Sequence, residues 1–174
     1  MPSYSSTIPE PTGRKHPLKP GALGLLLVMT AAAAAGGSVA SIPANDFYLA
    51  LNRPIWAPPP SLFGPAWTVL YLLMTIAAWT VVRVDGWKAA KPKIVLYAVQ
   101  LVANGMWTWL FFYLHSGAMA FVEILVLWTL IAATIIAFWR SHVLAGVLLL
   151  PYLAWVSFAM ALTWSVWQAN PGVL

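Results

Sequence analysis

Residues 51–71 read LNRPIWAPPPSLFGPAWTVLY, and this stretch holds five of the 14 prolines in the chain. Pro54 and the run Pro58–Pro60 cannot lie inside a regular helix, so they predict an ordered, extended loop. Gly64-Pro65 then marks the start of a new helix, because proline suits the first helical turn. A rigid loop therefore leads directly into a long apolar segment.

Two interpretations of this loop are open. In one, Trp56 lies at the depth of the lipid headgroups, where tryptophan is common in membrane proteins. In the other, the loop is a lid over a cavity. Trp67 and Tyr71 would line that cavity, since a spacing of four residues places both on one face of the new helix.

The composition predicts a membrane protein. The chain has 174 residues, of which 61% are hydrophobic and 7% are charged, whereas soluble domains are about 25% charged. At roughly 20 apolar residues per crossing, the chain has room for four to six spans. The absence of cysteine excludes disulfides, thiolate metal sites and a cysteine nucleophile. The basic residues lie beside the apolar segments, a pattern that sets membrane orientation and does not indicate a nucleic-acid partner.

We predict an all-α membrane domain over residues 21–170, with five spans at about 22–42, 65–82, 94–114, 118–139 and 143–167. Residues 1–20 are basic and proline-rich, which predicts a disordered tail. A signal peptide cleaved after Ser38-Val39-Ala40 is the alternative, but the apolar run continues to Ile42 and favours a retained span.

The links between the predicted spans are short. Residues 83–93 are expected to form a polar connection in which Pro92 starts the third helix. Residues 115–117 and 140–142 are tight links, which make the helices on either side antiparallel neighbours.

The positive charges predict the orientation. With five spans, eight of the nine Lys and Arg residues fall on one side of the membrane, and only Arg53 falls on the other. The positive-inside rule then places the N-terminus in the cytoplasm, and the proline-rich loop and the C-terminus outside.

Few ionisable groups lie in the predicted spans. No histidine is available there as an axial haem ligand, so we expect no metal and no resident cofactor. Glu123 is the one acidic residue inside a span. It is interpreted either as a side chain that reaches the membrane interface or as a functional group inside the bundle.

Two helical stripes are candidate walls of a ligand site. The third span carries Tyr97, Gln100, Asn104 and Trp107 on one face. This face forms either hydrogen bonds between helices or the polar wall of a pocket. The fifth span carries Tyr152, Trp155, Ala159 and Leu162, which form either ordinary packing or a slot for a flat ligand.

The small residues of the first span, Ala31 to Ser41, predict close helix packing or a cavity wall. An aromatic, apolar ligand would be held by stacking on tryptophan rings.

Three blocks of the sequence resemble the translocator protein family, also called tryptophan-rich sensory proteins or peripheral-type benzodiazepine receptors. The first runs from Leu51-Asn52-Arg53-Pro54 to Leu70-Tyr71, the second from Tyr97 to Phe111-Phe112, and the third from Pro151 to Phe158. The resemblance covers about residues 22–170 and is to the bacterial type. It implies a five-helix bundle, commonly dimeric, in a bacterial cell membrane, with a pocket closed by the first loop.

The family resemblance implies a membrane protein that binds porphyrins or related tetrapyrroles and transports, senses or regulates them. The alternative that it implies is a light- and oxygen-dependent porphyrin-degrading enzyme that uses Trp67 and Trp155. A small structural bundle without a ligand is a third interpretation. The predicted ligand-binding residues are Trp56, Trp67, Tyr71, Gln100, Asn104, Trp107, Trp155, Ala159 and Leu162.

Two positions depart from the family pattern. The segment from Leu162 to Gln168 has Trp164 where the family's cholesterol motif has tyrosine, and it lacks a basic residue. A specific sterol function is therefore not expected. Ile55 stands where bacterial relatives can carry tryptophan, so the lid is expected to contact a ligand differently.

Overall fold

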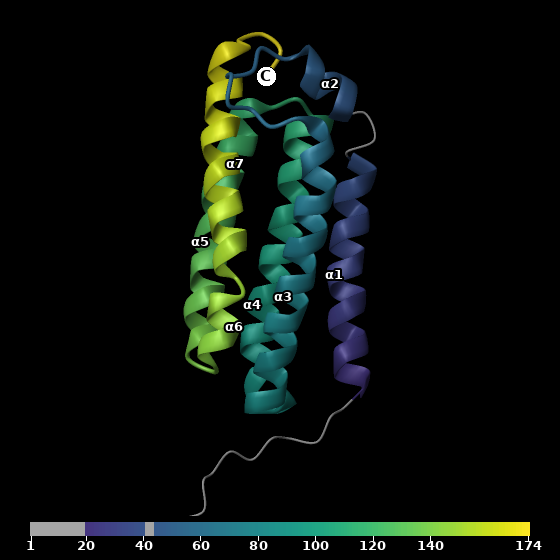
Figure 1. Ribbon diagram of the computed structural model, residues 1–174, viewed down its shortest axis with the longest axis vertical. Coiled ribbons are helices and arrows are strands. Elements are labelled where there is room, and N and C mark those ends of the chain that lie inside the picture. The colour runs from purple at the N-terminus through teal and green to yellow at the C-terminus, as the bar shows by residue number, and fades with distance from the viewer. Residues whose placement is uncertain (1–19, 41–43) are drawn as a thin grey trace, which may run out of the picture.

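The computed structural model describes residues 20–40 and 44–174 (Figure 1). Nearly all of the predicted N-terminal tail, and Ser41 and Ile42 of the predicted first span, lie outside the described residues. Within the described residues all regular secondary structure is helical. The long elements are α1 (Pro20–Ala40), α3 (Phe63–Asp85), α4 (Trp87–Thr108), α5 (Gly117–Trp139) and α7 (Leu150–Ala169).

The long helices have the length and composition of membrane spans. Within the described residues, four helical segments are long and apolar enough to cross a membrane: 60–85, 87–113, 117–139 and 143–169. The apolar stretch Gly21–Gly37 is shorter, but α1 as a whole has 21 residues and rises about 31 Å, close to the ~30 Å thickness of a bilayer's hydrocarbon core.

The helices alternate in direction, so the molecule has two distinct ends (Figure 1). One end holds the start of α1, the α3–α4 corner and the link from α5 to the short helix α6 (Val143–Val147). The other end holds the segment between α1 and α3, and the C-terminus. We name these the corner end and the cap end. Arg83, Lys88, Lys91, Lys93 and Arg140 belong to elements at the corner end, whereas Arg53 belongs to the cap end.

The outward faces of the bundle are apolar. Val95, Val99 and Val102 on α4 are exposed, as are Val122 and Val126 on α5. Helices that are hydrophobic on all sides bury one face against their neighbours and leave the other for lipid. The buried core is built from the inward faces of the same helices, with Met74, Tyr97 and Tyr152 among its largest fully buried side chains.

The cap segment, residues 44–62, contains a helix that the sequence patterns did not predict. It consists of α2 (Ala44–Ala50), an irregular loop over residues 51–59, and a 3₁₀ turn, η1 (Pro60–Leu62). The turn leads directly into α3, which begins at Phe63 and not at Pro65 as predicted. Pro65 still falls in the first helical turn, where backbone N–H groups have no partner within the helix.

The predicted polar connection over residues 83–93 was wrong in its length. α3 runs to Asp85 and α4 starts at Trp87, so Gly86 alone makes the corner. Its φ of 75° is easily adopted by glycine, which has no Cβ to clash. Pro92 therefore lies inside α4 and does not start it.

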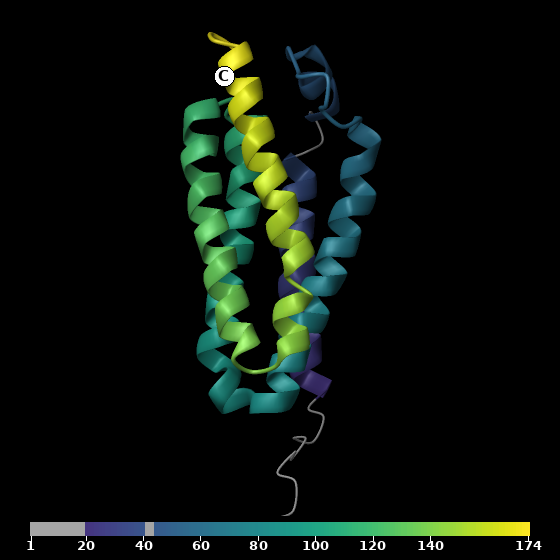
Figure 2. The ribbon, with the colours of Figure 1, turned by 60° about the vertical axis from the view of Figure 1, so that its left-hand side comes forward.

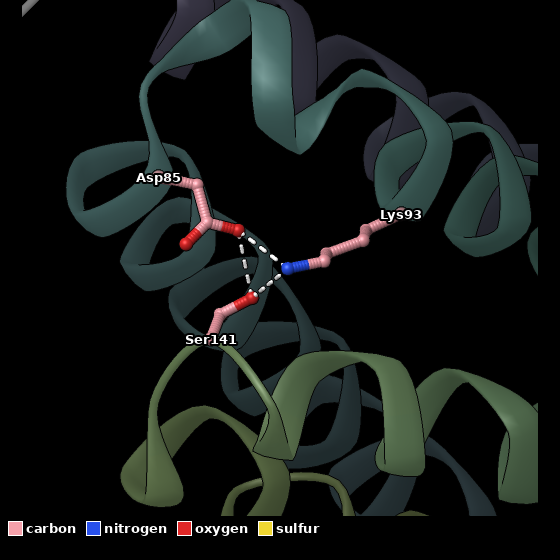
Figure 3. A network of polar contacts seen from close by, with 3 residues as sticks. All are labelled: Asp85, Lys93 and Ser141. Carbon is pink, nitrogen blue, oxygen red and sulfur yellow. Dashed lines mark hydrogen bonds and ion pairs between the residues drawn. The ribbon is translucent and has the colours of Figure 1, made fainter.

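A polar network ties three elements together at the corner end (Figure 3). Lys93 Nζ on α4 lies 2.6 Å from Asp85 Oδ2 on α3 and 2.6 Å from Ser141 Oγ in the α5–α6 link. Ser141 Oγ donates a hydrogen bond of 2.8 Å to the same carboxylate oxygen. Lys93, which was predicted to belong to a polar connection, therefore helps to join the ends of helices.

The predicted fifth span is divided into two helices. α6 (Val143–Val147) is followed by α7 from Leu150. Pro151 explains the division, because it has no N–H for the carbonyl of Val147 and its ring clashes with a continuous helix. α6 packs against α3 and α5, whereas α7 packs mainly against α5. Figures 1 and 2 show α3 and α7 diverging toward the cap end.

α4 ends in a short π-helix, η2 (Trp109–Tyr113). Its wider ring is seen in the bond from Leu114 N to Trp109 O, five residues back, at 2.9 Å. η2 packs against α1, α2 and α5, and so brings Leu110 and Phe111 into a second core beneath the cap segment.

Candidate functional site

A cavity of about 490 Å³ lies at the cap end, where α3 and α7 diverge. The cap segment closes it through Ala44, Tyr48 and Pro60, and α5 contributes Ile124 and Leu127. Its volume falls within the range of about 300–1,000 Å³ that is usual for small-molecule sites. The lining also includes Ala34, Gly37, Phe63, Gly64, Trp67, Thr68, Tyr71, Asn104, Trp107, Thr108, Phe111, Phe112, Trp155, Val156, Phe158, Ala159, Leu162, Thr163 and Val166.

One wall of the cavity is an aromatic cluster between α3 and α7. The ring centroids of Trp67 and Trp155 are 6.5 Å apart, with planes inclined by 81°. The ring centroids of Trp67 and Tyr71 are 5.5 Å apart, and those of Phe63 and Trp155 are 6.0 Å apart. Because the two indoles meet edge to face, a flat ligand cannot be sandwiched between them as they stand. It can lie against the face of one indole and the edge of the other.

A second wall comes from α4 and η2. Trp107 is stacked on Phe111 at 5.3 Å with an interplanar angle of 12°, and Phe112 meets its ring at 87°. The indole Nε1 of Trp107 is buried and has no hydrogen-bond partner within the described residues. This N–H is thus a buried donor that the described residues leave unpaired beside the cavity.

A polar pair interrupts the aromatic lining. Tyr71 Oη on α3 donates a hydrogen bond of 2.9 Å to Asn104 Oδ1 on α4. Both residues line the cavity, so this pair serves both roles that the sequence left open for Asn104, an interhelical bond and a polar wall. The bond fixes the orientation of the Asn104 amide, since its oxygen must face the phenol.

The rest of the predicted third-span stripe lies below the cavity. Tyr97 Oη is hydrogen-bonded to Thr30 Oγ1 on α1 at 2.7 Å, and Thr75 Oγ1 on α3 donates a hydrogen bond of 3.2 Å to the same Thr30 Oγ1. Gln100 is buried, with Nε2 3.8 Å from Met74 Sδ. These residues join helices and do not line the cavity.

Seven of the nine predicted ligand-binding residues line this one cavity: Trp67, Tyr71, Asn104, Trp107, Trp155, Ala159 and Leu162. Gln100 and Trp56 do not. Trp56 is 46% exposed and packs from outside against Phe158, with centroids 5.7 Å apart. The indole is therefore on the outer side of the cap segment.

One interpretation of the sequence expected the Glu123 side chain to extend to the membrane interface. The structure instead places this side chain inside the bundle. It is buried, and neither carboxylate oxygen has a hydrogen-bond partner within the described residues. Ile124 and Leu127 beside it on α5 line the cavity, which shows that this part of the helix faces the bundle. Tyr152 Oη is likewise buried without a partner among the described residues.

Sequence reasoning missed several cavity residues. Tyr48 belongs to α2, which was not predicted, and Ile124 and Leu127 belong to a helix with no aromatic or polar stripe. Phe63, Phe111, Phe112 and Phe158 stood in the quoted family blocks, so their presence there was a usable signal. On α1, Ala34 and Gly37 line the cavity, whereas Ala31, Ala32 and Ala35 are exposed.

Apolar helices of membrane length, packed around an aromatic cavity, define an integral multi-pass membrane protein. Residues 24–168 match the model of the TspO/MBR family, and the chain belongs to this family. It is 40% identical to Protein CrtK of Rhodobacter capsulatus, over 82% of this chain and 89% of the relative.

Two further relatives carry names that match the predicted family. The tryptophan-rich protein TspO of Chlorobaculum tepidum is 40% identical, over 79% of this chain and 87% of its own length. The human translocator protein is 36% identical, over 72% of this chain and 76% of its own length. The family prediction made from the three sequence blocks is thereby confirmed.

Proposed function

We propose that this chain binds a flat, apolar tetrapyrrole such as a porphyrin in the cavity at the cap end, and that it transports or senses that ligand. The observation that carries the proposal is a cavity of about 490 Å³ with aromatic walls on two sides and one Tyr71–Asn104 polar pair. Stacking on indole and phenyl faces suits a planar conjugated ring, and the few polar groups orient it.

The membrane arrangement is part of the same proposal. All five long helices cross a bacterial cell membrane, with the N-terminus in the cytoplasm. The ligand cavity then opens near the outer face, beneath the cap segment. The chain acts as a homodimer, as the family resemblance implies; light scattering of the protein in detergent measures its mass and tests this.

Binding is tested by titrating the purified protein with protoporphyrin IX and following the porphyrin absorption band. We expect Trp155→Ala to weaken binding at least about tenfold, because it removes a stacking face and buried area. Trp155→Phe should retain most of the affinity, since a ring remains.

Trp164→Ala is the matched control for this experiment. Trp164 lies on the same helix, is 47% exposed and does not line the cavity. Its removal should leave the affinity unchanged. Equal affinities for wild type, Trp155→Ala and Trp67→Ala would place the ligand elsewhere and overturn the proposal.

The contact between Trp67 and Trp155 favours one second candidate, light-dependent porphyrin degradation with oxygen as the oxidant. The ring centroids of these two indoles are 6.5 Å apart, and both rings line the proposed ligand cavity. Both would therefore be oxidisable groups next to the ligand. Under illumination this candidate predicts that wild type bleaches the porphyrin band. Trp155→Phe would bind the porphyrin but fail to bleach it. Bleaching at equal rates in both proteins argues against a redox role.

A further inference from the structure

At the C-terminal end of α7, the side chain of Asn170 is hydrogen-bonded to the cap segment. Its Oδ1 accepts a hydrogen bond of 2.8 Å from the backbone N–H of Asn52, and its Nδ2 donates one of 2.9 Å to the backbone carbonyl of Asn52. Nδ2 also donates to Val166 O, one turn back on α7, at 2.7 Å. Both amide hydrogens and the oxygen are therefore used, and the residue is only 7% exposed.

The contact joins residues 118 positions apart in the chain, and it lies where the cavity needs closing. α3 and α7 diverge at this end, and the cap segment spans the space between them through Ala44, Tyr48 and Pro60. On the α3 side the cap segment is continuous with the helix, and Tyr48 packs against Phe63 with centroids 5.5 Å apart. On the α7 side it is attached across space.

The attachment to α7 is partly apolar and partly polar, and Tyr48 and Leu51 of the cap segment share a buried apolar cluster with Leu162 and Val166 of α7. The apolar part also includes the aromatic contact of Trp56 with Phe158 on the outside of the cap segment. The polar part is specific: among the described residues, the hydrogen bonds between the cap segment and the end of α7 join Asn52 to Asn170, with one longer bond of 3.5 Å from Asn52 Nδ2 to Ala169 O. Other polar contacts of the cap segment are internal, such as Tyr48 Oη to Pro58 O at 3.1 Å.

We propose that Asn170 is a positioning residue that latches the cap segment to α7, and so sets how fast a ligand enters and leaves the cavity. The identity of that ligand rests on the proposed function, whereas the latch itself does not. Asn52 contributes two backbone groups that every residue except proline also carries. The specificity of the latch therefore resides in the Asn170 side chain.

The latch has a kinetic signature that distinguishes it from a simple structural contact. It holds the cap segment closed whether or not the cavity is filled. Removing it should therefore raise the association and dissociation rate constants together, by about tenfold for the loss of two hydrogen bonds, and change Kd by less than about threefold. Damage to the cavity itself would instead raise Kd.

The first experiment needs no ligand. Hydrogen–deuterium exchange of the full chain in nanodiscs is compared for wild type, Asn170→Ala and Asn170→Asp. Both variants should exchange faster in residues 51–59, since Asn170→Asp keeps the acceptor but loses the donor to the Asn52 carbonyl. Asn52→Ala should stay close to wild type, because the two backbone groups remain. Gln168→Ala, an exposed change on the same helix end, is the control.

The second experiment measures binding and release of protoporphyrin IX by stopped flow in the same proteins. Parallel increases of both rate constants in Asn170→Ala, with exchange changed only in the cap segment, support the latch. Unchanged exchange in residues 51–59, faster exchange along the whole of α7, or equal effects of Asn52→Ala and Asn170→Ala would overturn it. If wild type fails to bind the porphyrin, the proposed function is wrong, and the exchange result still decides the latch.

Discussion

At the scale of single residues, the Tyr71–Asn104 hydrogen bond supports a prediction on stability. Asn104→Leu leaves the Tyr71 hydroxyl without its acceptor in a half-buried position. We expect a loss of about 1 kcal/mol in unfolding free energy, together with weaker ligand binding. Thermal unfolding in detergent, followed by circular dichroism, measures the first effect.

A double variant separates the bond from the packing of these two residues. Tyr71→Phe removes the stranded hydroxyl, so Asn104→Leu with Tyr71→Phe should unfold at a higher temperature than Asn104→Leu alone. Strictly additive losses would show that the two side chains do not depend on each other and that the 2.9 Å bond contributes nothing measurable.

The same stripe shows what the sequence could and could not predict about single residues. A spacing of four placed Gln100 and Asn104 on one inward face, and both are buried. It did not give their depth: Gln100 lies four residues earlier in α4, a rise of about 6 Å, and falls below the cavity floor. The direction of the Trp56 side chain could not be predicted for another reason. An irregular loop has no repeating period, so the sequence does not tell which side chains face the cavity and which face outward.

At the scale of helices, glycine decides how closely two elements approach. A Cβ added to Gly146 on α6 would lie 2.5 Å from Cε3 of Trp139 at the end of α5. We expect Gly146→Ala to lower the unfolding free energy by about 1–3 kcal/mol, since the added Cβ would also lie 3.0 Å from Cβ of Trp139, which rotation of that side chain cannot move away.

Gly24→Ala is the matched control on α1. Nothing lies within 4 Å of the added methyl group, and alanine favours a helix by about 0.5–1 kcal/mol over glycine. The melting temperature should therefore hold or rise in Gly24→Ala and fall in Gly146→Ala. Equal melting temperatures of the two variants would mean that α5 and α6 can move apart at Gly146 without a loss of stability.

Helix boundaries show a related limit of the sequence patterns. Apolar runs located α1, α3, α4, α5 and α7, because each run is long and few charges interrupt it. The helix boundary predicted at the α3–α4 corner was wrong because of polar residues. Lys88, Lys91 and Lys93 indicated a connection between helices, but one glycine with positive φ is enough to reverse the chain. In the fifth span, the apolar run predicted one continuous helix over residues 143–167, whereas Pro151 divides it into α6 and α7.

At the scale of the whole molecule, the charge distribution predicts the orientation in the membrane. Arg83, Lys88, Lys91, Lys93 and Arg140 gather at the corner end, and the C-terminus lies at the cap end with Arg53. The positive-inside rule then places Leu174 outside the cytoplasm. Alkaline phosphatase, which needs disulfides formed in an oxidising compartment, should be active when fused after Leu174.

The reciprocal fusion completes this test. A fluorescent protein that matures in the cytoplasm should be bright when fused after Arg140 and dark when fused after Leu174. Bright fluorescence at Leu174, with inactive phosphatase there, would require either an even number of crossings or the opposite orientation.

The π-helical turn at the end of α4 bears on how relatives of different length are aligned. Its wider ring, seen in the bond from Leu114 N to Trp109 O, holds one residue more than an α-helical turn. A relative that lacks one residue there would close the ring to the ordinary size and keep Asn104 and Trp107 in place. A one-residue gap earlier in α4 would instead rotate the start of the helix by about 100° against the cavity wall. Insertions and deletions in this helix should therefore concentrate between Trp109 and Tyr113.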